Sequence, residues 1–224
     1  MATIGVLNEK PLHAALKEWY RIDGDQVEVP LDGFVIDLVR DGSLIEIQTR
    51  GFAAMRRKLD HLLDRYTIRI VYPVAAEKWI VKLDEDGDQI TRKRSPKRGI
   101  PADVCAELVS FPTLLSHPNL SVEVALTQEE EIRRPDAKNG WRRGGFVIEE
   151  RRLIDVGDVV VVDSPEALLD IIPKDLPDPF TTADVAVGLS RSRHLAQEVA
   201  YCLRESGAAE MVGRDKRGIL YRLP

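Results

Sequence analysis

The stretch FVIDLVRDGSLIEIQ, residues 34–48, constrains the fold more than any other part of the chain. Within it, the pair Asp41-Gly42 separates two runs of β-branched and apolar residues. Such a pair is the strongest short-range signal for a β-hairpin, because a two-residue turn of the primed type needs positive φ at both central positions. The resulting register predicts that Asp37 lies directly opposite Glu46.

Side chains alternate across a strand, so the hairpin has one apolar face and one mixed face. The apolar face is predicted to be core and consists of Phe34, Ile36, Leu38, Ile45 and Ile47. On the mixed face, Asp37 and Glu46 would have Cβ atoms ~4.5–5.5 Å apart, where like charges are destabilising. A divalent cation removes that cost, since Mg²⁺ binds carboxylate oxygens and keeps waters for substrate phosphate. The alternative is that both acids lie on a solvated face.

This pattern resembles the PD-(D/E)XK nuclease superfamily, in which one hairpin strand carries an acid and the next carries a D/E-x-K triplet. Asp37 matches the acid, and Glu46-Ile47-Gln48 matches the triplet. The resemblance implies an endodeoxyribonuclease in which Asp37, Glu46 and the Ile47 carbonyl bind Mg²⁺, with Mn²⁺ as a substitute. Gln48 departs from the usual Lys. A neutral Gln can orient the attacking water only by hydrogen bonding, so more electrostatic stabilisation would fall on the metal.

The elements around the hairpin follow the order of a restriction-endonuclease-like α/β core with a mixed sheet. Residues 8–20 are predicted to form a first helix, 26–29 a strand, 52–66 an amphipathic helix and 68–74 a buried strand. Members of the superfamily often take a further acid from the first helix. Glu9 lies on the apolar side of that helix and is the candidate to assist a second metal or the water. The alternative is a favourable interaction between Glu9 and the helix dipole.

Composition and charge describe a globular chain. The 224 residues are 44% hydrophobic and 31% charged, and no apolar run approaches the ~20 residues of a membrane span. The N-terminus lacks the pattern of a signal peptide. Cys105 and Cys202 form no CxxC pair, and the four histidines lack zinc spacing. We therefore expect a cytoplasmic protein. A net charge of −5 is compatible with DNA binding, because only the contact face has to be positive.

Basic residues gather in the segment 89–98, which contains no acid. Arg92, Lys93 and Arg94 are candidates to contact DNA phosphates, and the alternative is a solvated loop. The segment belongs to a hairpin predicted around Asp86-Gly87. That hairpin is part of a β-rich extension, about 77–163, whose place relative to the nuclease core the sequence leaves open.

The end of the chain resembles a winged helix-turn-helix module. A segment with three prolines, 173–180, is predicted to be a linker. A short helix, a turn, a helix over 193–205 and two strands around a basic tip at 213–218 follow it. Recognition helices place N-terminal residues in the major groove. The candidates for contact with DNA are Arg191, Arg193, His194 and Gln197 in the helix region and Lys216 and Arg217 in the tip. The alternative is a module used for dimerisation or intramolecular docking.

These patterns predict a nuclease domain at 1–172, a linker at 173–180 and a winged-helix domain at 181–224. The predicted function is hydrolysis of phosphodiester bonds in double-stranded or branched DNA, without involvement of a membrane. Cutting both strands would require two sites and hence a homodimer. Gln48 favours an alternative function. In that alternative the protein keeps the nuclease fold without catalytic activity and acts as a DNA-binding or regulatory protein. A third reading is an assembly subunit whose winged helix binds a protein.

Overall fold

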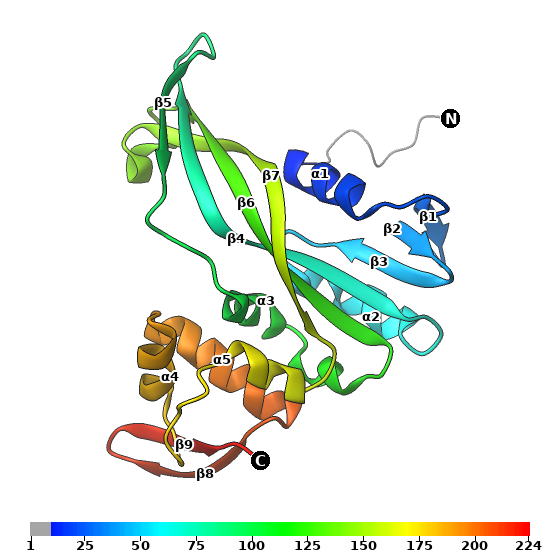
Figure 1. Cartoon of the computed structure of the whole chain (residues 1–224), viewed down its shortest axis with the longest axis vertical. Coiled ribbons are helices and arrows are strands. Elements are labelled where there is room, and N and C mark those ends of the chain that lie inside the picture. The colour runs from blue at the N-terminus through cyan, green and yellow to red at the C-terminus, as the bar shows by residue number, and fades with distance from the viewer. Residues whose placement is uncertain (1–9) are drawn as a thin grey trace. The chain divides into compact units, whose positions relative to one another are not determined.

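The structure is a computed structural model that describes residues 10–224, and it has the mixed α/β architecture expected from the sequence (Figure 1). Contacts divide the chain into two compact units. Among the described residues, unit 1 consists of 10–25, 73–100 and 125–159, and unit 2 consists of 26–72, 101–124 and 160–224. Within residues 10–224, no helix combines the length and hydropathy that crossing a bilayer requires.

Unit 2 begins with the strands that carry the candidate acids. They are β1 (Gln26–Leu31), β2 (Phe34–Arg40), β3 (Ser43–Ile47) and the first part of β4 (Ile68–Leu83). The first three strands form consecutive antiparallel pairs, and β3 pairs with β4 in parallel. The sheet is therefore mixed, as the sequence predicts.

The turn between β2 and β3 confirms the predicted hairpin. Asp41 has φ 48° and Gly42 has φ 79°, which are the two positive values that the turn type requires. Leu38 pairs with Ile45, as the Asp-Gly turn dictates. The apolar face of the hairpin is core: at most 2% of each residue is exposed for Ile36, Leu38, Ile45 and Ile47, although Phe34 is only half-buried.

The helical segments of unit 2 are shorter than predicted. The expected helix over 52–66 is a 3-10 turn, η2 (Phe52–Met55), followed by α2 (Arg56–Leu62), and a turn then leads into β4. The segment 101–116 forms three short helical pieces, and Pro112 cannot continue the helix before it. These pieces are η3 (Pro101–Val104), α3 (Cys105–Leu108) and η4 (Pro112–Ser116). Between α3 and η4, the Phe111 ring stacks on the Phe52 ring of η2 with centroids 5.4 Å apart.

Unit 1 contains α1 (Pro11–Tyr20) and most of each long strand. The predicted first helix starts later than expected, with Lys10 at the cap position and Pro11 in the first turn. The predicted strand over 68–74 is longer, because β4 continues without a break to Leu83. The other elements are β5 (Gln89–Arg94), β6 (Leu120–Pro135), η5 (Trp141–Arg143) and β7 (Phe146–Val162).

The sheet has the order β1-β2-β3-β4-β6-β7, with β5 paired to β4. The antiparallel β4–β5 pair confirms the hairpin predicted around Asp86-Gly87. Each of β4, β6 and β7 runs through a boundary between the two units. The division into compact units therefore differs from the domain boundary predicted at 173–180.

The C-terminal elements have the predicted order and lie in unit 2. After η6 (Glu166–Ile171) come α4 (Thr182–Leu189), α5 (Arg193–Ser206), β8 (Glu210–Asp215) and β9 (Gly218–Arg222). Figure 1 shows the β8–β9 hairpin beside the two helices.

The second of these helices, α5, packs against α3 and η4. The buried Cys202 thiol there donates a hydrogen bond to the Cys105 carbonyl oxygen at 3.6 Å. A hydrogen bond with Cys202, together with burial, raises the pKa of the Cys105 thiol. The protonated Cys105 thiol therefore serves as a packing group rather than as a nucleophile.

A capping box starts α4. The Asp184 carboxylate accepts hydrogen bonds from the backbone N–H and the hydroxyl of Thr181, both at 2.7 Å. The Thr181 hydroxyl oxygen in turn accepts from the backbone N–H of Asp184 at 3.4 Å. The hydrogen bond from the Thr181 side chain lowers the pKa of Asp184. The ionised carboxylate thus stabilises the folded state.

We expect Asp184→Asn to reduce the free energy of unfolding by ~0.5–2 kcal/mol near neutral pH. Because the pKa of Asp184 is lowered on folding, this contribution is present above the ordinary aspartate pKa of ~3.9 and is lost as the pH falls through the folded value. Urea denaturation near neutral pH and again near pH ~3 measures it. Asp170→Asn, at an exposed residue paired with Lys174, is the control. An equal deficit at both pH values would contradict the role of the charge.

Candidate functional site

The β2–β3 hairpin of unit 2 carries two carboxylates, Asp37 on β2 and Glu46 on β3. The paired positions of the two strands end at Leu38 and Ile45, directly beside these two acids. The Asp37 carboxylate accepts a hydrogen bond at 2.8 Å from the backbone N–H of Ile47, the residue after Glu46. The Asp37 side chain therefore lies against the neighbouring strand where the second acid stands.

Glu46 is a buried acid with a lysine partner. Only 5% of Glu46 is exposed, and its Oε1 lies 2.8 Å from Lys58 Nζ. Lys58 comes from α2, and its ammonium also donates to the Val35 carbonyl oxygen at 2.9 Å. A buried carboxylate needs such a partner, because an unpaired charge inside a protein is strongly destabilising.

Lys58 is a functional candidate that reasoning from the sequence missed. A signal for it was present, since Lys58 follows Met55 by three residues and precedes Leu62 by four. That spacing places it at the edge of the apolar stripe of α2. A lysine on the buried side of a helix needs an acid as partner, and the preceding strand offers Glu46.

Gln48 has a role in the loop that follows β3. Its amide nitrogen donates to the carbonyl oxygens of Arg50 at 2.6 Å and Gly51 at 3.4 Å. On the other side of the loop, Glu107 accepts from the backbone N–H groups of Gly51 and Phe52 at 2.8 and 3.0 Å. The two amide donors of Gln48 are thus used to fix the loop. Only the acceptor oxygen of Gln48 remains to orient a water.

The oxygen donors of the hairpin fit a magnesium ion by their chemistry. Two carboxylates and the Ile47 carbonyl are hard ligands, and Mg²⁺ usually takes one or two carboxylates plus waters and substrate phosphate. Among residues 10–224 there is no cluster of three or more His, Cys, Asp or Glu side chains that could hold a metal. Glu9, the predicted third acid, lies outside the described residues.

The basic segment of unit 1 is largely paired with acids. Arg92 lies 2.7 Å from a Glu130 oxygen, and Arg94 pairs with Glu77. The two guanidinium groups also lie over the Trp79 ring, at 4.8 and 5.9 Å from its centroid. Lys93, between them, is exposed. Arg92 and Arg94 would have to release their carboxylates before they could bind phosphate.

The candidates of the C-terminal elements are mostly exposed. Arg193, His194 and Gln197 lie in the first two turns of α5, and His194 Nε2 is 3.3 Å from a Glu198 oxygen. Arg191, in the turn before α5, is partly buried and donates to the Ser190 carbonyl oxygen.

The tip between β8 and β9 carries Lys216, which is exposed, and Arg217, which binds Asp215 at 3.0 Å. The hydrogen bond from Arg217 lowers the pKa of Asp215. Of the tip cations, Lys216 is therefore better placed than Arg217 to meet a phosphate.

Comparisons with known proteins identify a family. Residues 10–163 match the family described as "Domain of unknown function (DUF8091)". A protein from Treponema pallidum (strain Nichols), named "Uncharacterized protein", is 31% identical over 221 residues, which cover 98% of this chain and 87% of that protein. No solved structure matches the chain. Because the family match spans more than half of the chain, from α1 to the end of β7, this protein belongs to the DUF8091 family.

Proposed function

We propose that this protein is a metal-dependent endonuclease of the PD-(D/E)XK type that hydrolyses phosphodiester bonds in DNA. The observation that carries the proposal is the position of Asp37 beside the Glu46 segment, with Lys58 bound to Glu46. These three residues form an acid–acid–cation group at one place on the sheet. The superfamily pattern, in which the cation is the third residue of the triplet, would here be completed from α2.

The proposed cofactor is Mg²⁺, with Mn²⁺ as a substitute. Asp37, Glu46 and the Ile47 carbonyl would hold it. When bound, such an ion polarises a phosphoryl oxygen and lowers the pKa of a coordinated water. Since two carboxylates are too few to enclose the ion, substrate phosphate and water would complete its coordination.

Lys58 would supply the positive charge that Gln48 cannot. Its ammonium is held by Glu46 at 2.8 Å and by the Val35 carbonyl at 2.9 Å, so it is fixed before substrate arrives. A preorganised cation stabilises the negative charge that develops on phosphorus oxygens during in-line attack by water. Gln48 would keep the loop after β3 in shape and offer its oxygen to the water.

The C-terminal elements would form a winged helix that binds DNA. Supporting features are the helix-turn-helix order of α4 and α5, the β8–β9 hairpin, and the exposed Arg193 and Lys216. An isolated antiparallel bridge joins Phe180 to Tyr221 of β9. The module would position duplex or branched DNA, and the proposed location of the enzyme is the cytoplasm.

One observation favours a second candidate function, a nuclease fold that binds DNA without cutting it. The donors of Gln48 are directed to backbone carbonyls, and the carboxylate of Glu46 is neutralised by Lys58. A site in that state binds a cation less tightly than two unpaired carboxylates would. Cleavage assays on the wild type and on variants of the hairpin acids separate the two functions.

We expect the purified protein to nick supercoiled plasmid in Mg²⁺ or Mn²⁺ and to stop when EDTA is added. Asp37→Asn and Glu46→Gln should each lower the rate by about a hundredfold or more, because either change removes a charged oxygen ligand. Asp170→Asn, in an exposed pair outside the site, should cut at the wild-type rate. An absence of cleavage by the wild type on duplex, single-stranded and branched DNA would favour the non-catalytic function.

Lys58→Met should lower the single-turnover cleavage rate by about 10²- to 10³-fold, since it removes one preorganised positive group. Lys58→Arg should recover part of the loss. Lys138→Met removes an equivalent charge from an exposed turn and is the control. Because Lys58 also neutralises a buried acid, thermal unfolding of each variant is measured in parallel. Cleavage by a folded Lys58→Met protein at the wild-type rate would exclude the proposed role of the ammonium.

Arg193→Gln and Lys216→Gln should weaken binding to duplex DNA and reduce the slope of log K against log salt by ~0.9 for each phosphate that the variant no longer neutralises. Fluorescence anisotropy over a salt series measures both quantities. Lys174→Gln, in the segment before α4, is the matched control. Unchanged affinity and slope in both test variants would show that the C-terminal module does not bind DNA.

A further inference from the structure

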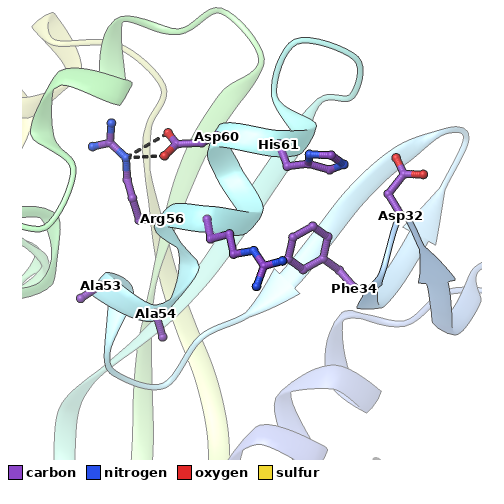
Figure 2. Close-up of a pocket in the computed structure, with 8 residues that line it drawn as sticks. Asp32, Phe34, Ala53, Ala54, Arg56, Asp60 and His61 are labelled. Carbon is purple, nitrogen blue, oxygen red and sulfur yellow. Dashed lines mark hydrogen bonds and ion pairs between the residues drawn. The ribbon is translucent and has the colours of Figure 1, made fainter.

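A hollow of about 560 Å³ in unit 2 lies between the β1–β2 turn and the η2–α2 segment (Figure 2). Its volume is within the ~300–1,000 Å³ range of sites for small organic ligands. The side chains that shape it are two rings, two acids and two arginines: Phe34, His61, Asp32, Asp60, Arg56 and Arg57. The proposed function assigns no role to this hollow.

The two rings provide an aromatic platform. Phe34 is half-buried and His61 is exposed, and their ring centroids lie 5.8 Å apart with planes tilted by 53°. Figure 2 shows both rings on the side of α2 away from the Arg56–Asp60 pair. A gap of 5.8 Å is too narrow to admit a third ring, so a ligand would stack on the outer surface of the pair. Base–aromatic stacking of this kind accepts any base, because every base has a π-face.

The charges of the hollow leave one positive group available. Arg56 binds Asp60 through two contacts of 2.9 and 3.0 Å, and Arg65 binds Asp32 at 2.6 Å. Both acids are therefore neutralised by arginine. Arg57 is exposed, and within residues 10–224 its guanidinium makes no hydrogen bond or ion pair. A guanidinium in this state is suited to a phosphate, which it can bind through two parallel hydrogen bonds.

The hollow adjoins the proposed catalytic group. The Phe34 ring centroid lies 5.9 Å from Lys58 Nζ, which in turn contacts Glu46. In a stacked strand, neighbouring nucleotides are spaced by ~3.4 Å, so a base on Phe34 would be within about two nucleotides of a phosphate at Lys58. Arg57 directly precedes Lys58 in α2, so the two cations could bind neighbouring phosphates of one strand.

We infer that this hollow binds an unpaired nucleotide of a nucleic-acid strand, with the base stacked on Phe34 and His61 and the phosphate held by Arg57. The base has to be unpaired, because both faces of a base inside a duplex are covered by its neighbours. The inference deepens the proposed nuclease function and rests on it for the direction of the strand. It gives the enzyme a preference for single-stranded segments, flaps or branch points next to the cut.

The test measures binding of the full-length protein, in EDTA, to a short single-stranded DNA that contains one 2-aminopurine. Fluorescence anisotropy gives the affinity, and the 2-aminopurine emission reports stacking of the base on the protein. Phe34→Leu should weaken binding about tenfold and remove the change in emission, since it eliminates one base–aromatic stack. Arg57→Gln should weaken binding and lower the salt slope by ~0.7.

Three controls make the result specific. Phe34→Tyr keeps a ring and should bind as the wild type does. Lys174→Gln removes an exposed charge outside the hollow and should also be neutral. Binding of a blunt duplex should be unaffected by either test variant. Arg57 is exposed, so Arg57→Gln remains informative even where Phe34→Leu fails to fold.

Wild-type affinity of both Phe34→Leu and Arg57→Gln for the single strand would overturn the inference, as would an equal loss of duplex binding. Because the measurement needs no metal and no cleavage, it is independent of the plasmid assay. If the wild type never cuts DNA but both variants lose single-strand binding, the nucleotide site is supported and the nuclease function is excluded. If the wild type cuts DNA and both variants bind the single strand normally, the nuclease function is supported and the nucleotide site is excluded.

Discussion

A carboxylate in the middle of an apolar strand has to be neutralised where it stands, and Glu46 meets that condition through Lys58. The Glu46–Lys58 pair also fixes the position of α2 against the hairpin, because the Lys58 ammonium must reach both Glu46 and the Val35 carbonyl. The neighbouring positions of α2 then follow: Arg57 and His61 lie beside Phe34 and the β1–β2 turn. Breaking a buried pair by removing one partner typically costs ~3–5 kcal/mol, so the candidate site and the local fold depend on the same contact.

Features encoded by neighbouring residues could be predicted from the sequence. The Asp41-Gly42 turn fixed the register of β2 and β3, and the second Asp-Gly pair gave the β4–β5 hairpin. The C-terminal elements followed from caps and breakers, such as Gly207 with φ 88° at the end of α5. The lengths of the strands and helices were harder to predict from the sequence, as were the residues that each side chain contacts. The pattern of β4 beyond Pro73 does not separate one long strand from two.

The candidate site was predicted in part for a similar reason. Local alternation in the hairpin was sufficient to predict that Asp37 and Glu46 share one face. The link from Glu46 to Lys58 joins residues twelve apart on different elements, so no local pattern prescribes it.

The net charge of the chain also did not predict which cations are available to a ligand. Burial raises the pKa of Glu131, but hydrogen bonds from Lys78 and Arg133 lower it further than burial raises it. Lys78 and Arg133 are therefore paired with an acid of unit 1 and are not available to a ligand. Arg92 and Arg94 are paired in the same way.

Three strands, β4, β6 and β7, each leave one compact unit and end in the other. Every unit is consequently assembled from three separate lengths of chain. No single truncation can excise either unit intact, and a protease cut inside one of these strands damages both. Recombination between genes would likewise have to transfer the two units as one inheritable block.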